Sequence, residues 1–206
     1  MIGAIGVDAV RHVHDRRDHL ALAALPLLLG FHQLDEAFVW WGLQGHVPAA
    51  VGRVALWIYL LIAFVVLPLY VPLAVLALER RERMRVMVPF VVIGAGVSVV
   101  LLAAMVRGPL TARLAQYHVA YGLGLHNALG IIALYVVAVC GAFLVSRYRD
   151  VRIYGIANLV AVVVLARLTV DGFASLWCAY AALLSAAIAL HMRFAKTHRA
   201  HPYLFT

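Results

Sequence analysis

Residues 20–42, LALAALPLLLGFHQLDEAFVWWG, decide the fold of this chain. A helix of this length extends about 35 Å, which is enough to cross a hydrocarbon core of roughly 30 Å. Four polar side chains lie about 18–24 Å from its first residue: His32, Gln33, Asp35 and Glu36. An ionisable group at that depth costs on the order of 3 kcal/mol or more unless it has partners. The stretch therefore predicts a membrane span that carries a polar site.

The composition indicates a single integral membrane domain over residues 1–206. Hydrophobic residues make up 66% of the chain and charged residues only 13%, whereas soluble domains carry about 25% charged residues. The net charge of +8 comes from short basic clusters that stand beside apolar runs. Such clusters meet lipid headgroups, so the lipid bilayer is the expected partner and nucleic acid is not.

The hydropathy pattern predicts an all-α, polytopic helix bundle with six spans, at about residues 20–42, 54–78, 86–106, 121–146, 153–171 and 174–192. A turn at 42–48 and a basic loop at 79–85 separate the first three spans. Gly122, His126 and Gly130 recur at every fourth position of the fourth span and predict a groove on one helix face. Residues 1–10 are apolar but too short to cross, so we interpret them as an amphipathic lead or the remainder of a seventh span.

The basic residues predict the orientation. Thirteen of the 17 Lys and Arg residues lie in segments 11–19, 79–85, 147–152 and 193–206, and three lie in the alternate connections. By the positive-inside rule, this asymmetry predicts that both ends of the six-span unit, and with them the C-terminus, face the cytoplasm. The polar residues within the spans then gather in the outer leaflet, in a pocket that opens toward the outer face.

The expected pocket draws on three spans and contains His32, Gln33, Asp35, Glu36, His126, Asn127, Arg167 and Asp171. His32 and Glu36 are four residues apart, and Asp35 lies within about 100° of both, so all three project from one helix face. Arg167 lies inside a span, where an unpaired ion is costly. We therefore expect it to pair with Glu36 or Asp35.

Several functions are compatible with this cluster. It could bind or translocate a small polar ligand, an ion or a proton, which is the function we favour. It could instead only fix helix packing, as in a non-catalytic subunit of an oligomer or a larger membrane complex. A metal-dependent membrane hydrolase could hold zinc or iron on His32, Glu36, His126 and Asp171. Their spacing is not a recognised metal motif, and haem held by His32 and His126 is weaker still. No cofactor is therefore predicted, and a non-enzymatic function is favoured.

Two stretches resemble an uncharacterised family of bacterial multi-span membrane proteins. Residues 27–41, LLLGFHQLDEAFVWW, are similar to that family's Leu-Leu-Phe-Gly-Ile-Gln-Gln-x-x-Glu-Gly-x-x-Trp motif, and residues 174–191, ASLWCAYAALLSAAIALH, to its last span. The resemblance implies a bacterial cytoplasmic (inner) membrane protein, with seven spans in the full architecture. It matches family positions at Gln33, Glu36, Trp40, Trp177 and Cys178. His32 and Ala37 depart from the family's Gln and Gly. The resemblance therefore favours Glu36, rather than His32, as the central residue of the site. The resemblance implies no particular reaction.

Overall fold

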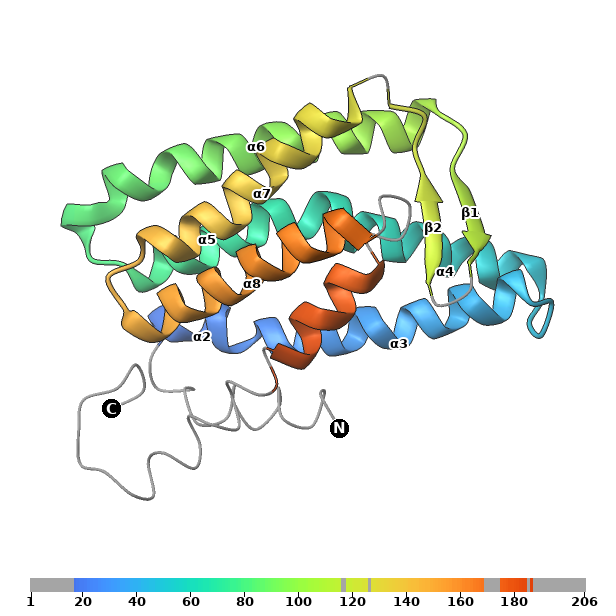
Figure 1. Cartoon of the computed structure of the whole chain (residues 1–206), viewed down its shortest axis with the longest axis horizontal. Coiled ribbons are helices and arrows are strands. Elements are labelled where there is room, and N and C mark those ends of the chain that lie inside the picture. The colour runs from blue at the N-terminus through green and yellow to red at the C-terminus, as the bar shows by residue number, and fades with distance from the viewer. Residues whose placement is uncertain (1–16, 116–117, 126, 169–174, 185, 187–206) are drawn as a thin grey trace.

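The computed structural model describes residues 17–115, 118–125, 127–168, 175–184 and 186. Over these residues the chain is a helix bundle with one short β-hairpin at one end (Figure 1). In order, its elements are α2 (Arg17–Ala23), α3 (Leu25–Leu43), α4 (Ala49–Leu61), a π-helical turn (Ile62–Val66), α5 (Leu67–Leu78), a 3-10 turn (Arg81–Arg83), α6 (Met84–Arg107), β1 (Thr111–Leu114), β2 (Val119–Gly122), α7 (Ala128–Val145), α8 (Arg149–Leu168) and a final unlabelled helix, Ser175–Leu184. The predicted helical architecture is confirmed.

Four helical segments within the described ranges are long and apolar enough to cross a membrane: Leu20–Leu43, Ala49–Leu78, Arg81–Arg107 and Ala128–Val145. They correspond to the first four predicted spans. The predicted spans at 153–171 and 174–192 overlap α8 and the helix Ser175–Leu184. The remaining residues of those two spans, apart from Ala186, lie outside the part of the chain that the structure describes.

The turn between α3 and α4 follows the prediction. Gly45 adopts a left-handed backbone conformation with φ 76°, which ends the helix without the strain that a side chain would bring. Gly42 and Gly52 then face each other, and a Cβ atom on Gly42 would lie 2.6 Å from the Gly52 Cα. The two helices therefore pack closely as an antiparallel pair from this turn onward.

The helix predicted over residues 121–146 begins at Ala128 instead. The preceding residues form an antiparallel hairpin in which Thr111 pairs with Gly122 and Leu114 pairs with Val119. Gly124 has a φ of 62°, a conformation that interrupts a right-handed helix. Gly122 and Gly130 therefore do not share a helix face, and the predicted groove is wrong in this part; His126 lies outside the described residues.

A π-helical turn joins α4 and α5 and frees a carbonyl group. Leu67 N–H donates to Ile62 O, five residues back. The next carbonyl in that pattern, Ala63 O, faces Pro68, which has no N–H to donate. The Tyr135 hydroxyl of α7 donates to Ala63 O instead, over 2.7 Å. A side chain from another helix thus satisfies a backbone group that would otherwise stay unpaired in the apolar interior.

The second proline of this helix permits a close contact with α6. Pro72 lacks the N–H that would otherwise bond Pro68 O, so this carbonyl is free. Gly94 of α6 lies directly against it, and a Cβ atom there would overlap the Pro68 carbonyl oxygen. Helices α5 and α6 therefore approach at a point where a side chain has no room.

A buried glutamate ties two connections together at the end of the bundle opposite the hairpin. Glu79, only 7% exposed, follows α5. Its Oε1 accepts hydrogen bonds from the Ser146 hydroxyl and the Arg147 backbone N–H, each over 2.7 Å. These residues connect α7 to α8, so Glu79 holds the α5–α6 and α7–α8 connections side by side.

We expect Gly94→Ala to lower the free energy of unfolding by about 1–3 kcal/mol, because the added methyl group overpacks the contact with Pro68. Gly96→Ala is the matched control, since a Cβ atom at Gly96 meets nothing within 4 Å. Thermal unfolding of both variants in detergent measures the difference. Equal stability of the two variants would show that α5 and α6 are not in close contact at Gly94.

Candidate functional site

Helix α3 directs its polar residues into the protein. His32, Asp35 and Glu36 are 0%, 8% and 6% exposed. Phe31 and Leu34, on the other side of the helix, are 54% and 66% exposed. The helical period places apolar side chains on one face and polar ones on the other, and here the apolar face is the outer one. This arrangement suits a helix whose outer face meets lipid, and the predicted common face of the three polar residues is confirmed.

Three aromatic rings stack beside these residues. Tyr59 of α4 lies against His32 with ring centroids 4.1 Å apart and an interplanar angle of 18°. Tyr121 of β2 stacks on Tyr59 at 4.6 Å and 21°. Two near-parallel rings at these distances occupy opposite faces of Tyr59, which is 0% exposed. The stack connects α3, α4 and the hairpin, and it restricts the orientation of each ring.

Neutral side chains surround the Glu36 carboxyl group. The Tyr121 hydroxyl lies 3.4 Å from Oε1 and Gln33 Nε2 lies 3.5 Å from Oε2. The hydroxyls of Tyr59 and Ser175 also lie within interaction range of this carboxyl. Hydrogen bonds from hydroxyls to a carboxylate are usually about 2.5–2.7 Å long. The carboxyl group is therefore surrounded by donors without being tightly bonded to them.

Several buried polar atoms beside Glu36 have no hydrogen-bond partner among the described residues. They are Nδ1 and Nε2 of His32, Oδ2 of Asp35 and Oη of Tyr59. Each unsatisfied buried group costs about 1–3 kcal/mol, so native proteins seldom leave several together. Their concentration around one carboxyl group indicates that this region can receive a polar species.

The structure brings together only part of the predicted pocket. His32, Gln33, Asp35 and Glu36 are adjacent on α3, whereas the Asn127 side chain lies over Gly130 and is exposed. Arg167, on α8, is exposed as well. His126 and Asp171 lie outside the described residues.

The predicted ion pair between Arg167 and Glu36 or Asp35 is absent. Arg167 is exposed while both acids are buried, and no ion pair within 4 Å joins them in the described part of the chain. The physical reason is that the last turn of α8 leaves Arg167 on its outer side, where the guanidinium group is exposed.

Four residues of the site lie outside the predicted set: Tyr59, Tyr121, Ser175 and Cys178. Tyr59 could have been found by counting from the turn at 42–48, because antiparallel helices place it opposite residues near 33. Tyr121 lies in the hairpin, which places its ring on Tyr59. Ser175 and Cys178 come from a distant part of the sequence, so no local spacing places them beside Glu36, although the family resemblance includes Cys178.

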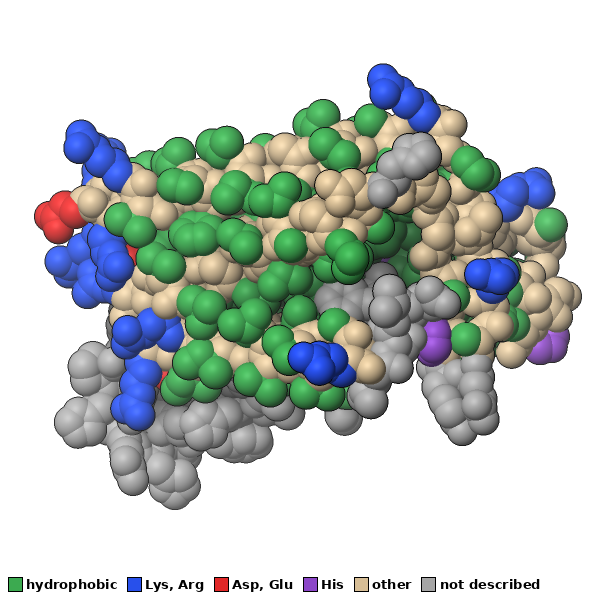
Figure 2. Space-filling model, turned by 45° about the horizontal axis from the view of Figure 1, so that its top comes forward, with side chains coloured by type: hydrophobic (Ala, Val, Ile, Leu, Met, Phe, Trp, Pro, Cys, Tyr) green, Lys and Arg blue, Asp and Glu red, His purple; other side chains and the backbone are tan. Residues whose placement is uncertain are grey.

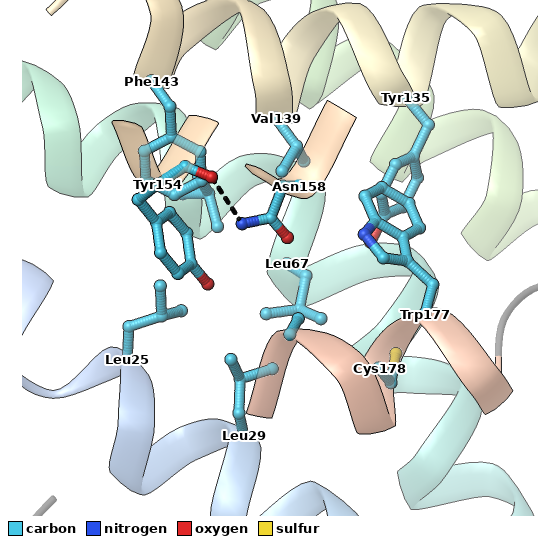
Figure 3. A pocket seen from close by; sticks show the side chains of 12 residues that line it. Leu25, Leu29, Leu67, Tyr135, Val139, Phe143, Tyr154, Asn158, Trp177 and Cys178 are labelled. Atoms are coloured by element: carbon cyan, nitrogen blue, oxygen red, sulfur yellow. Dashed lines mark hydrogen bonds between the residues drawn. The ribbon is translucent and has the colours of Figure 1, made fainter. Parts of the chain in front are cut away.

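A small apolar cavity adjoins the site (Figure 3). It measures about 40 Å³ and lies among α3, α5, α7, α8 and the helix Ser175–Leu184. Asn158 is the amide-bearing residue of its lining, and its Nδ2 donates to Tyr154 O over 2.9 Å. Cys178 borders this cavity and also interacts with Tyr59 and Glu36. The polar site and the apolar interior therefore meet at Cys178.

Within the described ranges, no three His, Cys, Asp or Glu side chains lie close enough together to hold a metal ion. Two of the four predicted metal ligands, His126 and Asp171, are outside those ranges. Of the four predicted metal ligands, the described residues therefore include only His32 and Glu36.

Comparisons with known proteins identify a family without an assigned activity. The sequence profile of a family described as "Family of unknown function (DUF6629)" matches residues 1–203. No curated protein matches the chain, and no solved structure matches its fold.

We expect Glu36→Gln and Arg167→Met to act independently on stability, because the two side chains do not touch. A double-mutant cycle on unfolding in mixed micelles should give a coupling energy below about 0.5 kcal/mol, with Arg167→Met alone close to wild type. Recovery of the Glu36→Gln loss by Arg167→Met would instead establish an ion pair between them.

Proposed function

We propose that this chain, which belongs to the DUF6629 family of unknown function, is a multi-pass membrane protein that binds or translocates a small polar species or a proton at Glu36. The site lies in the outer half of the membrane, and the protein resides in a bacterial cytoplasmic membrane with its C-terminus in the cytoplasm. The carrying observation is a buried carboxyl group, surrounded by unpartnered polar atoms, in a bundle of apolar helices.

The outer surface of the bundle supports a membrane location. Hydrophobic side chains cover much of the face seen in Figure 2 between the two ends of the helices. On α8 the exposed large apolar residues recur at helical spacing, at Ile153, Ile156, Val160, Val163 and Val164. This stripe suits contact with lipid. It supports α8 as a fifth span, with the helix Ser175–Leu184 belonging to a sixth.

The distribution of arginine supports the proposed orientation. The α5–α6 and α7–α8 connections, together with the first turns of α6 and α8, lie at one end of the bundle (Figure 1) and carry Arg80, Arg81, Arg83, Arg85, Arg147, Arg149 and Arg152. The α3–α4 turn and the hairpin lie at the other end. By the positive-inside rule the arginine-rich end faces the cytoplasm. Glu36 is seven residues before the end of α3, so the site is nearer the opposite, outer end.

Charge balance supports an exchangeable partner for Glu36. Every arginine whose side chain the structure describes is at least partly exposed, and none is buried beside this carboxyl. A carboxylate in hydrocarbon without a counter-ion costs several kcal/mol. A proton or a bound polar species removes that cost, and its arrival and departure would be the function of the site.

We expect the Glu36 carboxyl group to change its protonation when the pH of the medium changes. Infrared difference spectra of the reconstituted protein between acidic and alkaline buffer should contain a carboxylic-acid C=O band that Glu36→Gln abolishes. Glu79→Gln is the matched control, because Glu79 is equally buried but is held by Ser146 and Arg147. Loss of the Glu79 carboxyl group in Glu79→Gln should leave the Glu36 band in place.

A spectrum without any Glu36 band, together with unchanged ligand-free stability over the same pH range, would favour a purely structural role. Elemental analysis of the purified protein tests the alternative of a metal-dependent hydrolase. Stoichiometric zinc or iron that disappears in Glu36→Gln would favour that alternative over proton or solute binding.

We expect a cysteine at position 82 to be labelled from the cytoplasm and a cysteine at position 46 from the outside. Glu82 and His46 are both exposed and lie in connections at opposite ends of the bundle. The native Cys140 and Cys178 are buried and free, so they give little background. An impermeant maleimide added to intact cells should modify His46→Cys and not Glu82→Cys. The reverse pattern would invert the proposed orientation.

A further inference from the structure

We infer that the species held at Glu36 is a monovalent alkali cation of about the size of Na⁺, bound by oxygen atoms of Glu36, Tyr59, Tyr121 and Ser175. This inference rests on the proposed function and narrows its ligand class. The four residues come from α3, α4, β2 and the helix Ser175–Leu184, so the site forms only when all four elements are assembled.

The donor atoms are those that hard cations prefer. Glu36 supplies carboxylate oxygens, and the hydroxyls of Tyr121, Tyr59 and Ser175 face the same carboxyl group. Alkali and alkaline-earth cations select such oxygen ligands, whereas transition metals favour nitrogen and sulfur. One carboxylate with neutral hydroxyls carries a single negative charge. A monovalent cation therefore leaves the assembled site neutral, as hydrocarbon surroundings require.

Asp35 does not add a second carboxylate to this set. It is the neighbour of Glu36 on α3, and both side chains are buried on the inward side of the helix. Like charges on two neighbouring buried carboxyl groups repel each other, so only one of the two is favoured in the ionised form. The charge of the site is thus set by one acid, which distinguishes a monovalent from a divalent ligand.

The spacing of two oxygens fits a shared cation better than a direct hydrogen bond. Tyr121 Oη and Glu36 Oε1 are 3.4 Å apart. Hydroxyl-to-carboxylate hydrogen bonds are usually about 2.5–2.7 Å long. Adjacent oxygens of an octahedron around a cation with metal–oxygen distances of about 2.4 Å are separated by about 3.4 Å; Ca²⁺, close to Na⁺ in radius, has such distances. A cation between these two oxygens would use the present spacing without moving either.

Tyr59 supplies a second, independent observation. Its side chain is 0% exposed, and its Oη has no hydrogen-bond partner among the described residues although it lies within interaction range of Glu36. The stack with His32 and Tyr121 keeps the ring in this position. A proton on Glu36 would form one hydrogen bond and satisfy one acceptor. A cation accepts lone pairs from Tyr59, Tyr121 and the carboxylate together.

The test is the thermal stability of the detergent-purified full chain as NaCl replaces N-methylglucamine chloride at constant ionic strength. We expect a saturable rise in Tm for wild type, because a ligand that binds only the folded state stabilises it. Glu36→Gln should abolish the Na⁺-dependent rise. Tyr59→Phe and Tyr121→Phe each remove one oxygen and keep the ring stack, so their half-saturation should move to at least about tenfold higher Na⁺. Glu79→Gln is the control and should respond as wild type does.

Parallel titrations with KCl and CaCl₂, and infrared spectra of the same samples, separate the outcomes. A Tm that responds to Ca²⁺ and not to Na⁺ would overturn the monovalent assignment. No Na⁺ response in wild type, with the Glu36 infrared band still changing with pH, would overturn the cation site while the proposed function stands. Absence of both signals would remove the proposed function as well. If Glu36→Gln does not fold, Tyr59→Phe and Tyr121→Phe carry the test, and unchanged half-saturation in both would overturn the site.

Discussion

A carboxyl group inside a bundle of apolar helices is the constraint on which the structure depends. An apolar interior neither solvates a charge nor supplies hydrogen bonds, so protein or a ligand must satisfy Glu36. Helix α3 turns its acids inward and exposes Phe31 and Leu34. Tyrosine and serine hydroxyls from three other elements then reach the carboxyl group. The site therefore forms only when the bundle assembles, because no single helix carries all of its residues.

The backbone is subject to the same constraint and is satisfied by different means. Prolines in the helix Ala49–Leu78 free two carbonyl groups. The Tyr135 hydroxyl bonds one of them, and the Gly94 backbone packs against the other. At the opposite end from the hairpin, Glu79 is buried but receives two short hydrogen bonds. The chain thus contains one buried glutamate whose Oε1 receives two hydrogen bonds of 2.7 Å and one whose donors Tyr121 and Gln33 lie 3.4 and 3.5 Å away, and this difference separates a structural acid from a candidate ligand.

The aromatic stack explains how an incompletely bonded carboxyl group can stay in an ordered site. His32, Tyr59 and Tyr121 hold one another by ring contacts, and the Tyr121 hydroxyl donates a long hydrogen bond of 3.4 Å to Glu36 Oε1. In the proposed function, the hydroxyl oxygens are positioned before a ligand arrives, which lowers the entropy cost of binding. Cys178 extends this ordered region to the apolar cavity. The architecture therefore favours selection of a small species by preset oxygen positions.

The sequence by itself determined the helical class, the first three long apolar helices with their turns, and the inward face of His32, Asp35 and Glu36. These depend on hydrophobic runs and on the 3.6-residue period, which are local properties. Only the tertiary structure decided that residues 111–122 form a hairpin, that Tyr59 stacks on His32 and Tyr121 on Tyr59, and that Arg167 stays exposed. The hairpin depends on cross-strand pairing and on Gly124. The other two depend on how separate helices rotate as they pack, and no spacing along the chain encodes that rotation.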